Sequence, residues 1–138
     1  MREILFRGKR LENGEWVEGA FCPKNSEGDI PCIIVYNGTL AGWWFEVAPA
    51  TFGQFTGLLD KNGKRIFEGD IVRKTGGPEL KPPIGKVVFE NGAFLWAYRN
   101  FKLAPFVKSE AIPGYGIFDY QYEIIGNIHD NPELVEGE

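Results

Sequence analysis

Short stretches in which apolar and polar residues alternate follow one another along this chain, and Asn-Gly dipeptides stand between several of them. Asn-Gly is the preferred pair for a two-residue β-hairpin turn, because both residues tolerate positive φ angles. The four dipeptides with apolar segments nearby are Asn13-Gly14, Asn37-Gly38, Asn62-Gly63 and Asn91-Gly92. The pattern therefore predicts a series of β-hairpins.

The hairpin at Asn91-Gly92 has the clearest pattern. A two-residue turn there pairs Glu90 with Ala93, Phe89 with Phe94, Val88 with Leu95 and Val87 with Trp96. Because side chains alternate between the two faces of a strand, one face collects the large apolar residues. We expect this face to be core: Val87, Phe89, Phe94, Trp96 and Tyr98.

The segment 56–72, "TGLLDKNGKRIFEGDIV", predicts a second hairpin followed by a turn into a new strand. A two-residue turn at Asn62-Gly63 places Asp60 opposite Arg65, which is a favourable cross-strand pair. Glu68-Gly69 then redirects the chain, and Asp70 is expected to hydrogen-bond to nearby backbone amides. The predicted core residues are Leu58, Ile66, Ile71 and Val72.

The remaining pattern adds further strands and one short helical turn. We expect strands at 3–9, 15–22, 30–36, 42–47 and 122–128, and a proline-rich loop at 75–83. "DNPEL" at 130–134 has a capping asparagine followed by proline, which predicts a short helical turn. Residues 100–120 give no clear pattern. The predicted fold is an all-β roll or barrel.

Length and composition support a globular chain. The 138 residues, of which 43% are hydrophobic, are typical of one domain, so we treat 1–138 as a single unit with an N-terminal hairpin part at 1–50 and a barrel part at 51–138. No stretch approaches the roughly 20 apolar residues that span a bilayer, and the start resembles no secretory signal. We expect a cytoplasmic protein with no membrane partner.

The net charge of −4 is unevenly distributed. Residues 1–58 carry −2, residues 59–108 carry +5 and residues 109–138 carry −7. The basic middle segment is either an anion-binding face or a segment that pairs with the acidic tail. We favour pairing with the tail, because an acidic protein repels nucleic acid at long range. If the segment is instead an anion-binding face, the residues that make the contacts are Lys61, Lys64, Arg65, Arg73 and Lys74.

The sequence predicts no catalytic, cofactor or metal site. The single histidine is His129, and the sequence contains no nucleophile motif that it could serve as a base. We expect His129 to lie in a surface turn. Cys22 and Cys32 are too far apart in sequence for a zinc site with one histidine, and we expect small buried thiols. Glu68 and Asp70 could act as an acid–base or Mg²⁺ pair, but a tight turn explains them more simply.

The aromatic stretch "GWWFEV" at 42–47 indicates an interaction surface. Adjacent residues of a strand face opposite sides, so Trp43 and Trp44 are not expected to share one environment. We expect one of them in the core and the other exposed or buried against another subunit. With Phe45 they form the candidate apolar interface, although stacking on nucleic-acid bases is an alternative.

Several segments together resemble the YopX family, small proteins encoded by bacteriophages and prophages. The segments are "FTGLLDKNGKRIFEGDIV" at 55–72, "GKVVFENGAF" at 85–94, "YEIIGNIHDNPEL" at 122–134 and the N-terminal "LFRGKRLENGEWVEGAF". The resemblance implies an SH3-like barrel, a phage or prophage origin and self-association. It implies no activity and no catalytic residues.

A second likeness concerns "EGDIVRKTGGP" followed by "PPIGKVVF", which is similar to the KOW type of SH3-like strand-loop-strand. Such modules contact RNA or the transcription and translation machinery. The expected function is therefore a non-enzymatic, self-associating protein-interaction module whose partners are itself and a phage or host protein. The alternative is a nucleic-acid-associated module that uses the basic middle segment.

Overall fold

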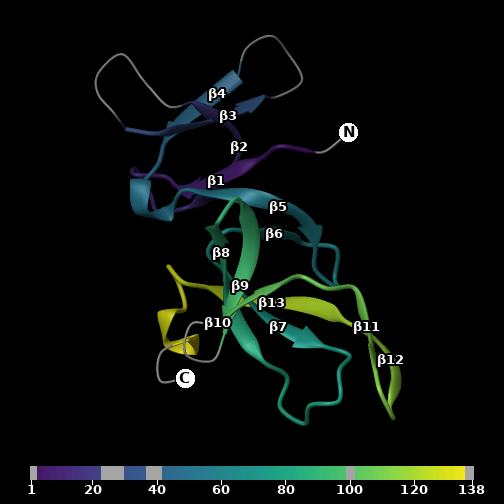
Figure 1. Ribbon diagram of the computed structural model, residues 1–138. Helices are drawn as coiled ribbons and strands as arrows, with labels where there is room; N and C mark the ends of the chain where they lie inside the picture. Colours follow the sequence, from purple (N-terminus) through teal and green to yellow (C-terminus); the bar gives the residue numbers. More distant parts are fainter. Residues whose placement is uncertain (1–2, 23–29, 37–41, 99–101, 136–138) are drawn as a thin grey trace. The chain divides into compact units, whose positions relative to one another are not determined.

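The computed structural model describes residues 3–22, 30–36, 42–98 and 102–135. The fold is all-β, with antiparallel strands and two short 3₁₀ turns, which confirms the predicted fold class (Figure 1). The chain forms two compact units, residues 1–57 and 58–138. The division predicted from the sequence lies nearby, after residue 50.

The first unit is built around five strands of an antiparallel sheet, in the order β4-β3-β2-β1-β5, and a sixth strand, β6 (Arg65–Phe67), follows β5 in this sheet. Its elements are β1 (Phe6–Lys9), β2 (Trp16–Cys22), β3 (Cys32–Tyr36), β4 (Gly42–Glu46), the 3₁₀ turn η1 (Pro49–Thr51) and β5 (Gly53–Leu59), which continues into the second unit. The end of β1 bonds to the chain after β4, because Ala48 donates to the carbonyl of Lys9 and Leu11 donates to that of Glu46. The sheet therefore curls back on itself at this end.

The core of the first unit is small. Its buried apolar side chains are Cys32, Ile33, Val47 and Phe55. Gly8 lies directly against Val47, since a Cβ at residue 8 would stand 2.8 Å from Val47 Cβ. Three phenylalanine rings, those of Phe6, Phe21 and Phe52, pack together with centroids 4.6–5.3 Å apart.

The second unit contains a sheet in the order β10-β9-β8-β7-β13 and a separate hairpin, β11-β12. Its elements are β6 (Arg65–Phe67), β7 (Asp70–Thr75), β8 (Ile84–Glu90), β9 (Ala93–Tyr98), β10 (Lys102–Pro105), β11 (Ser109–Ile112), β12 (Gly116–Asp119), β13 (Gln121–Asn127) and the 3₁₀ turn η2 (Pro132–Leu134). The core cluster consists of Ile66, Val72, Val87, Trp96 and Tyr122.

The hairpin β8-β9 has the predicted register, with Val87 opposite Trp96 and Phe89 opposite Phe94. Asn91 and Gly92 have φ angles of 53° and 80°, which a type I′ turn requires. The burial prediction is wrong at the tip, where Phe89 is 50% exposed. The hairpin extends past the core, so its outer phenylalanines pack on each other instead, with ring centroids 4.9 Å apart.

The hairpin at Asn62-Gly63 differs from its predicted form. Asp60 pairs with Lys64 through a backbone bond, which leaves a three-residue loop in which Gly63 has a positive φ angle and Asn62 does not. The Asp60 carboxylate accepts bonds from the amides of Asn62 and Lys64, and these bonds fix the loop. The predicted cross-strand pairing of Asp60 with Arg65 is therefore wrong by one residue.

The turn at Glu68-Gly69 agrees with its prediction. Gly69 has a φ angle of 92°, and the buried Asp70 carboxylate accepts a bond of 2.8 Å from the amide of Phe67. Ile66, Ile71 and Val72 are buried as expected. Leu58 is 42% exposed, so its assignment to the core is wrong. It faces a groove described below.

Residues 102–120, which gave no clear pattern, contain three short strands. The β11-β12 hairpin turns at Pro113-Gly114, where Tyr115 donates to the carbonyl of Ile112 and Gly114 has a φ angle of 87°. Proline followed by a glycine with positive φ is the signature of a type II turn. The predicted helical turn at 130–134 is present as η2, with Asn131 at its N-cap position.

Candidate interaction surfaces

Strand β4 carries the most exposed aromatic pair of the described residues. Trp43 is 64% exposed and Trp44 is 58% exposed, although they lie on opposite faces of the strand. The expectation that one of them lies in the core is wrong, because β4 is the last strand of its sheet in the described chain. Phe45 is half-buried.

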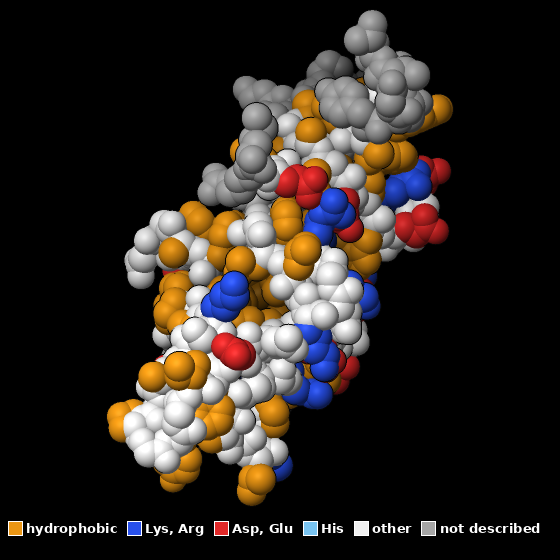
Figure 2. Space-filling view, turned by 90° about the vertical axis from the view of Figure 1, so that its right-hand side faces the viewer, with side chains coloured by type: hydrophobic (Ala, Val, Ile, Leu, Met, Phe, Trp, Pro, Cys, Tyr) orange, Lys and Arg blue, Asp and Glu red, His pale blue; other side chains and the backbone are white. Residues whose placement is uncertain are grey.

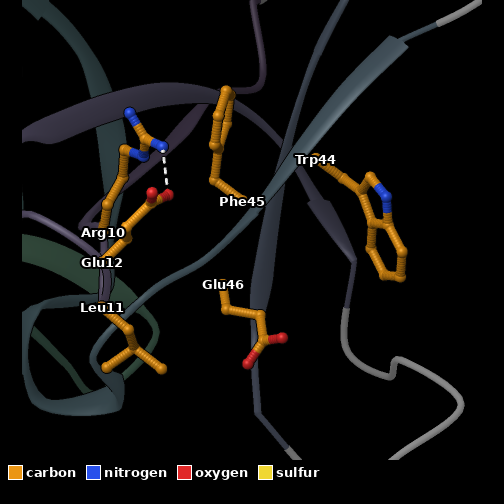
Figure 3. Close-up of a pocket in the computed structure, with 6 residues that line it drawn as sticks. All are labelled: Arg10, Leu11, Glu12, Trp44, Phe45 and Glu46. Carbon is orange, nitrogen blue, oxygen red and sulfur yellow. Dashed lines mark hydrogen bonds and ion pairs between the residues drawn. The ribbon is translucent and has the colours of Figure 1, made fainter.

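A hollow of about 550 Å³ lies beside β4 and is lined by Arg10, Leu11, Glu12, Trp44, Phe45 and Glu46 (Figure 3). The guanidinium of Arg10 stands 4.3 Å from the centre of the Phe45 ring and bonds to Glu12 at 2.9 Å. Figure 3 shows the Trp44 ring pointing away from Arg10 and Glu12. Trp44 is therefore largely exposed among the described residues.

Part of the backbone along the outer side of β4 has no neighbouring strand in the described chain. Val47 donates to the carbonyl of Pro31, so alternation directs the backbone groups of Trp43 and Phe45 toward β3 and those of Trp44 away from it. The carbonyl of Glu46 is bonded to Leu11. Among the described residues, the part of this edge that bonds to no other segment is therefore short and is centred on Trp44.

A second hollow, of about 470 Å³, lies within the second unit. It is walled by the end of β5 and the following turn on one side and by residues 106–108 on the other. Sequence reasoning missed it because residues 100–120 had no assigned structure. The one available signal was Leu58-Leu59, two successive leucines that cannot share one face of a strand.

The five cations of the basic middle segment do not form one uncommitted face. Lys61 and Arg73 both contact Glu123, with nitrogen–oxygen distances of 2.9 and 3.5 Å. The bond from Lys61, partly opposed by burial and helped by the charge of Arg73, holds the pKa of Glu123 below its ordinary value. The ammonium of Lys74 stands 3.9 Å from the centre of the Tyr120 ring.

Lys64 and Arg65 lie at the exposed hairpin turn and the start of β6. Figure 2 shows basic side chains scattered over the visible face, several of them beside acidic ones. The contacts to Glu123 join the basic segment to the acidic C-terminal part, which is the arrangement that the sequence favoured.

Two of the polar groups considered for chemistry lie near each other at the Gly69 turn, since a Cβ at Gly69 would stand 3.4 Å from Nε2 of His129. Asp70 bonds to the Phe67 amide, and His129 lies in the turn after β13, where its own amide bonds to Asn127. Within the described ranges, no group of three or more His, Cys, Asp or Glu side chains is arranged to hold a metal ion. Nor is any helix in those ranges long and apolar enough to cross a membrane.

The two cysteines lie directly opposite each other on β2 and β3, and no disulfide joins them. Cys32 is fully buried and Cys22 is half-buried. Burial raises the pKa of the Cys32 thiol, and the neighbouring Cys22 and Glu46 raise it further. Cys32 therefore stays protonated, as expected of a core thiol.

Comparison with known proteins gives a family and a similar solved structure. The family model described as "YopX protein" matches residues 5–136, nearly the whole chain, which confirms the resemblance drawn from the sequence motifs. The crystal structure of protein EF1440 from Enterococcus faecalis is similar, with 28% sequence identity and a TM-score of 0.57 over 99% of this chain and 100% of that one. No curated protein matches.

Proposed function

The chain belongs to the YopX family, and from this premise we propose that it is a phage- or prophage-encoded accessory protein of the bacterial cytoplasm. It acts without catalysis, as an interaction module that associates with itself and with a phage or host protein. The observation that carries this proposal is the exposure of both Trp43 and Trp44 on the outermost strand of the first unit.

Two adjacent exposed tryptophans are unusual on a surface that faces only water. Tryptophan is enriched at the centre of protein interfaces, where its large ring is removed from solvent. Because the rings lie on opposite faces of β4, a partner that covers both has to contact both faces of the sheet at this edge. An extended strand added beside β4 does this, with its own side chains on both faces.

The same arrangement supports self-association. A second copy presents the same edge, and two identical strands can pair in antiparallel fashion about a two-fold axis. Trp43 and Trp44 of each copy then pack against the other copy. The hollow beside Arg10 and Phe45 is adjacent to this edge and receives a side chain of the added strand.

Sedimentation velocity over a range of protein concentrations tests the proposal. We expect the wild-type protein to associate as its concentration rises, and the double variant Trp43→Ala/Trp44→Ala to sediment as a monomer. Tyr115→Ala is the matched control, because Tyr115 is an exposed aromatic residue of the second unit. A wild-type protein that is monomeric throughout, or a double variant that associates equally well, would refute self-association through β4.

A nucleic-acid-associated module is the alternative proposal and rests on the +5 charge of residues 59–108. We rank it second because Lys61, Arg73 and Lys74 already make contacts within the chain. Fluorescence anisotropy with mixed-sequence DNA and RNA at low and physiological salt distinguishes the two. Binding that weakens steeply with salt and is lost in Arg73→Glu/Lys74→Glu would favour this alternative.

A further inference from the structure

The hollow of about 470 Å³ in the second unit has the size of a small-molecule site. Ile66 and Tyr122 form its buried floor. Leu58 and Leu59 stand along one side, 42% and 59% exposed, and Phe106 lies half-buried on the other. Large apolar side chains thus line much of this hollow.

Backbone bonds fix both walls of this groove against strand β13 and the residue that precedes it. On one side the amide of Lys61 donates to the carbonyl of Tyr122 at 2.8 Å. On the other side the amide of Tyr120 donates to the carbonyl of Lys108, also at 2.8 Å. The groove is therefore formed before any ligand arrives, which lowers the entropy lost on binding.

The acidic group at the groove is fully committed to the backbone. The Asp60 carboxylate accepts from the amides of Asn62 and Lys64 at 2.9 Å and from that of Ile124 at 3.2 Å. Burial raises the pKa of Asp60, but these amides outweigh it and hold the pKa below its ordinary value. The carboxylate charge is thus spread over three donors and repels an anion in the groove less than a bare carboxylate does.

Two further polar groups of the lining can donate, whereas Lys61 is paired with Glu123 and Tyr120 donates to Glu110. Lys108 is exposed, and the described residues place no carboxylate within ion-pair distance of it. The Tyr122 hydroxyl accepts a bond of 3.0 Å from the amide of Val107, and no described residue accepts its proton. Burial keeps this hydroxyl protonated by raising the pKa of Tyr122, against the smaller opposite effect of that amide.

We propose that this groove binds a small amphipathic carboxylate. The hydrocarbon part lies against Leu58, Leu59 and Phe106, and the carboxylate accepts from the Lys108 ammonium and the Tyr122 hydroxyl. The site lies in the second unit and does not depend on the association proposed for strand β4.

Titration of ¹⁵N-labelled protein followed by amide NMR shifts tests the site. The probes are decanoate, decyl alcohol and decylamine, which share one chain and differ in charge. Each is used below the concentration at which it forms micelles or separates from solution. We expect decanoate to saturate shifts at residues 58–61, 106–108 and 120–122. The alcohol is expected to bind more weakly and the amine most weakly, since the groove offers donors.

Two lysine variants separate a specific anion site from general adsorption. We expect Lys108→Glu to weaken decanoate binding about tenfold, because it replaces an attraction by a repulsion near the surface. Lys102→Glu, an equal charge change at an exposed position of β10, is expected to leave the affinity unchanged. Leu59→Ser, another exposed position, is expected to weaken all three probes together.

Three results would overturn the proposal. These are the absence of saturable shifts at the groove, equal affinity for all three probes, and equal effects of the two lysine substitutions. A monomeric protein that still binds decanoate would refute the β4 proposal alone, so the two proposals fail separately.

Discussion

The carboxylate of Asp60 accepts a hydrogen bond of 3.2 Å from the backbone amide of Ile124, which lies 64 residues further along the chain. The same side chain bonds to two amides of its own turn. One buried aspartate thus shapes a hairpin loop and attaches it to strand β13. Its removal affects local and long-range structure together.

Asp60→Ala is expected to destabilise the protein by about 1–3 kcal/mol, because it leaves buried amides without an acceptor. Urea denaturation at neutral pH measures the change. Asp119→Ala, at an exposed position of β12, is the control and is expected to lie within about 0.5 kcal/mol of wild type. Equal small effects of both substitutions would contradict the role assigned to Asp60.

The pH dependence of stability follows from the same carboxylate. The folded pKa of Asp60 lies below its ordinary value. Its stabilisation is therefore complete above the unfolded pKa of about 4 and is lost as pH falls through the folded pKa. Denaturation experiments between pH 3 and pH 7 measure the free energy of unfolding. As the pH falls, this free energy should decrease less in Asp60→Asn than in the wild-type protein. The two pH profiles would run parallel if Asp60 made no contribution.

Two aromatic residues on the same face of the β8-β9 hairpin should differ sharply in their effect on stability. Trp96 is buried in the core cluster, whereas Phe89 at the tip is half exposed. Trp96→Ala is expected to cost about 3–5 kcal/mol through the cavity it leaves, and Phe89→Ala about 1 kcal/mol. Chemical denaturation gives both values, and a comparable loss for each would contradict the observed depth of the core.

Trp96→Phe refines this comparison. The indole Nε1 of Trp96 is buried and has no hydrogen-bond partner among the described residues. Phenylalanine removes that polar group and keeps part of the ring, so we expect it to destabilise much less than alanine does.

Gly76 and Gly114 form a matched pair, with φ angles of 89° and 87°. Alanine is strained equally at both, by about 1–2 kcal/mol. At Gly76 the added Cβ would also collide with the carbonyl oxygen of Asp119, whereas at Gly114 it meets nothing within 4 Å. Thermal or urea denaturation should show Gly76→Ala to be less stable than Gly114→Ala by at least about 1 kcal/mol.

The two thiols should react at different rates with Ellman's reagent. Cys22 is partly accessible, whereas Cys32 is fully buried and its pKa is raised. We expect one rapid thiol in the native protein and the second only on unfolding. The variant Cys22→Ser should lose the rapid phase, and a rapid phase that persists there would place Cys32 at the surface.

Local signals predicted the hairpins well, because turn chemistry acts over a few residues. Asn91-Gly92 forms the expected type I′ turn, and Pro113-Gly114 carries an equally local type II signal that the irregular composition of 100–120 obscured. At Asn62-Gly63 the same dipeptide adopts another turn, because Asp60 bonds to the loop and to Ile124. The turn preference of an Asn-Gly dipeptide contains no information about such a distant partner.

Burial was harder to predict than pairing. The alternation of residues shows which side chains share a face, but not where the core ends along a strand, and Phe89 lies beyond that end. Neither the hydrophobicity of Leu58 nor the alternation of Trp43 and Trp44 shows whether another layer covers these side chains. The groove arises from segments about 50 residues apart, so neither segment indicates it alone.

The position of strand β13 near the end of the chain determines when the second unit can fold during synthesis. This strand pairs with β7, supplies Tyr122 to the core and provides the Ile124 amide to Asp60. A growing chain synthesised only as far as β10 exposes one edge of β7 and lacks a core side chain. The second unit therefore cannot close until synthesis has passed Asn127, and until then the unpaired edge is a place where nascent chains can associate wrongly.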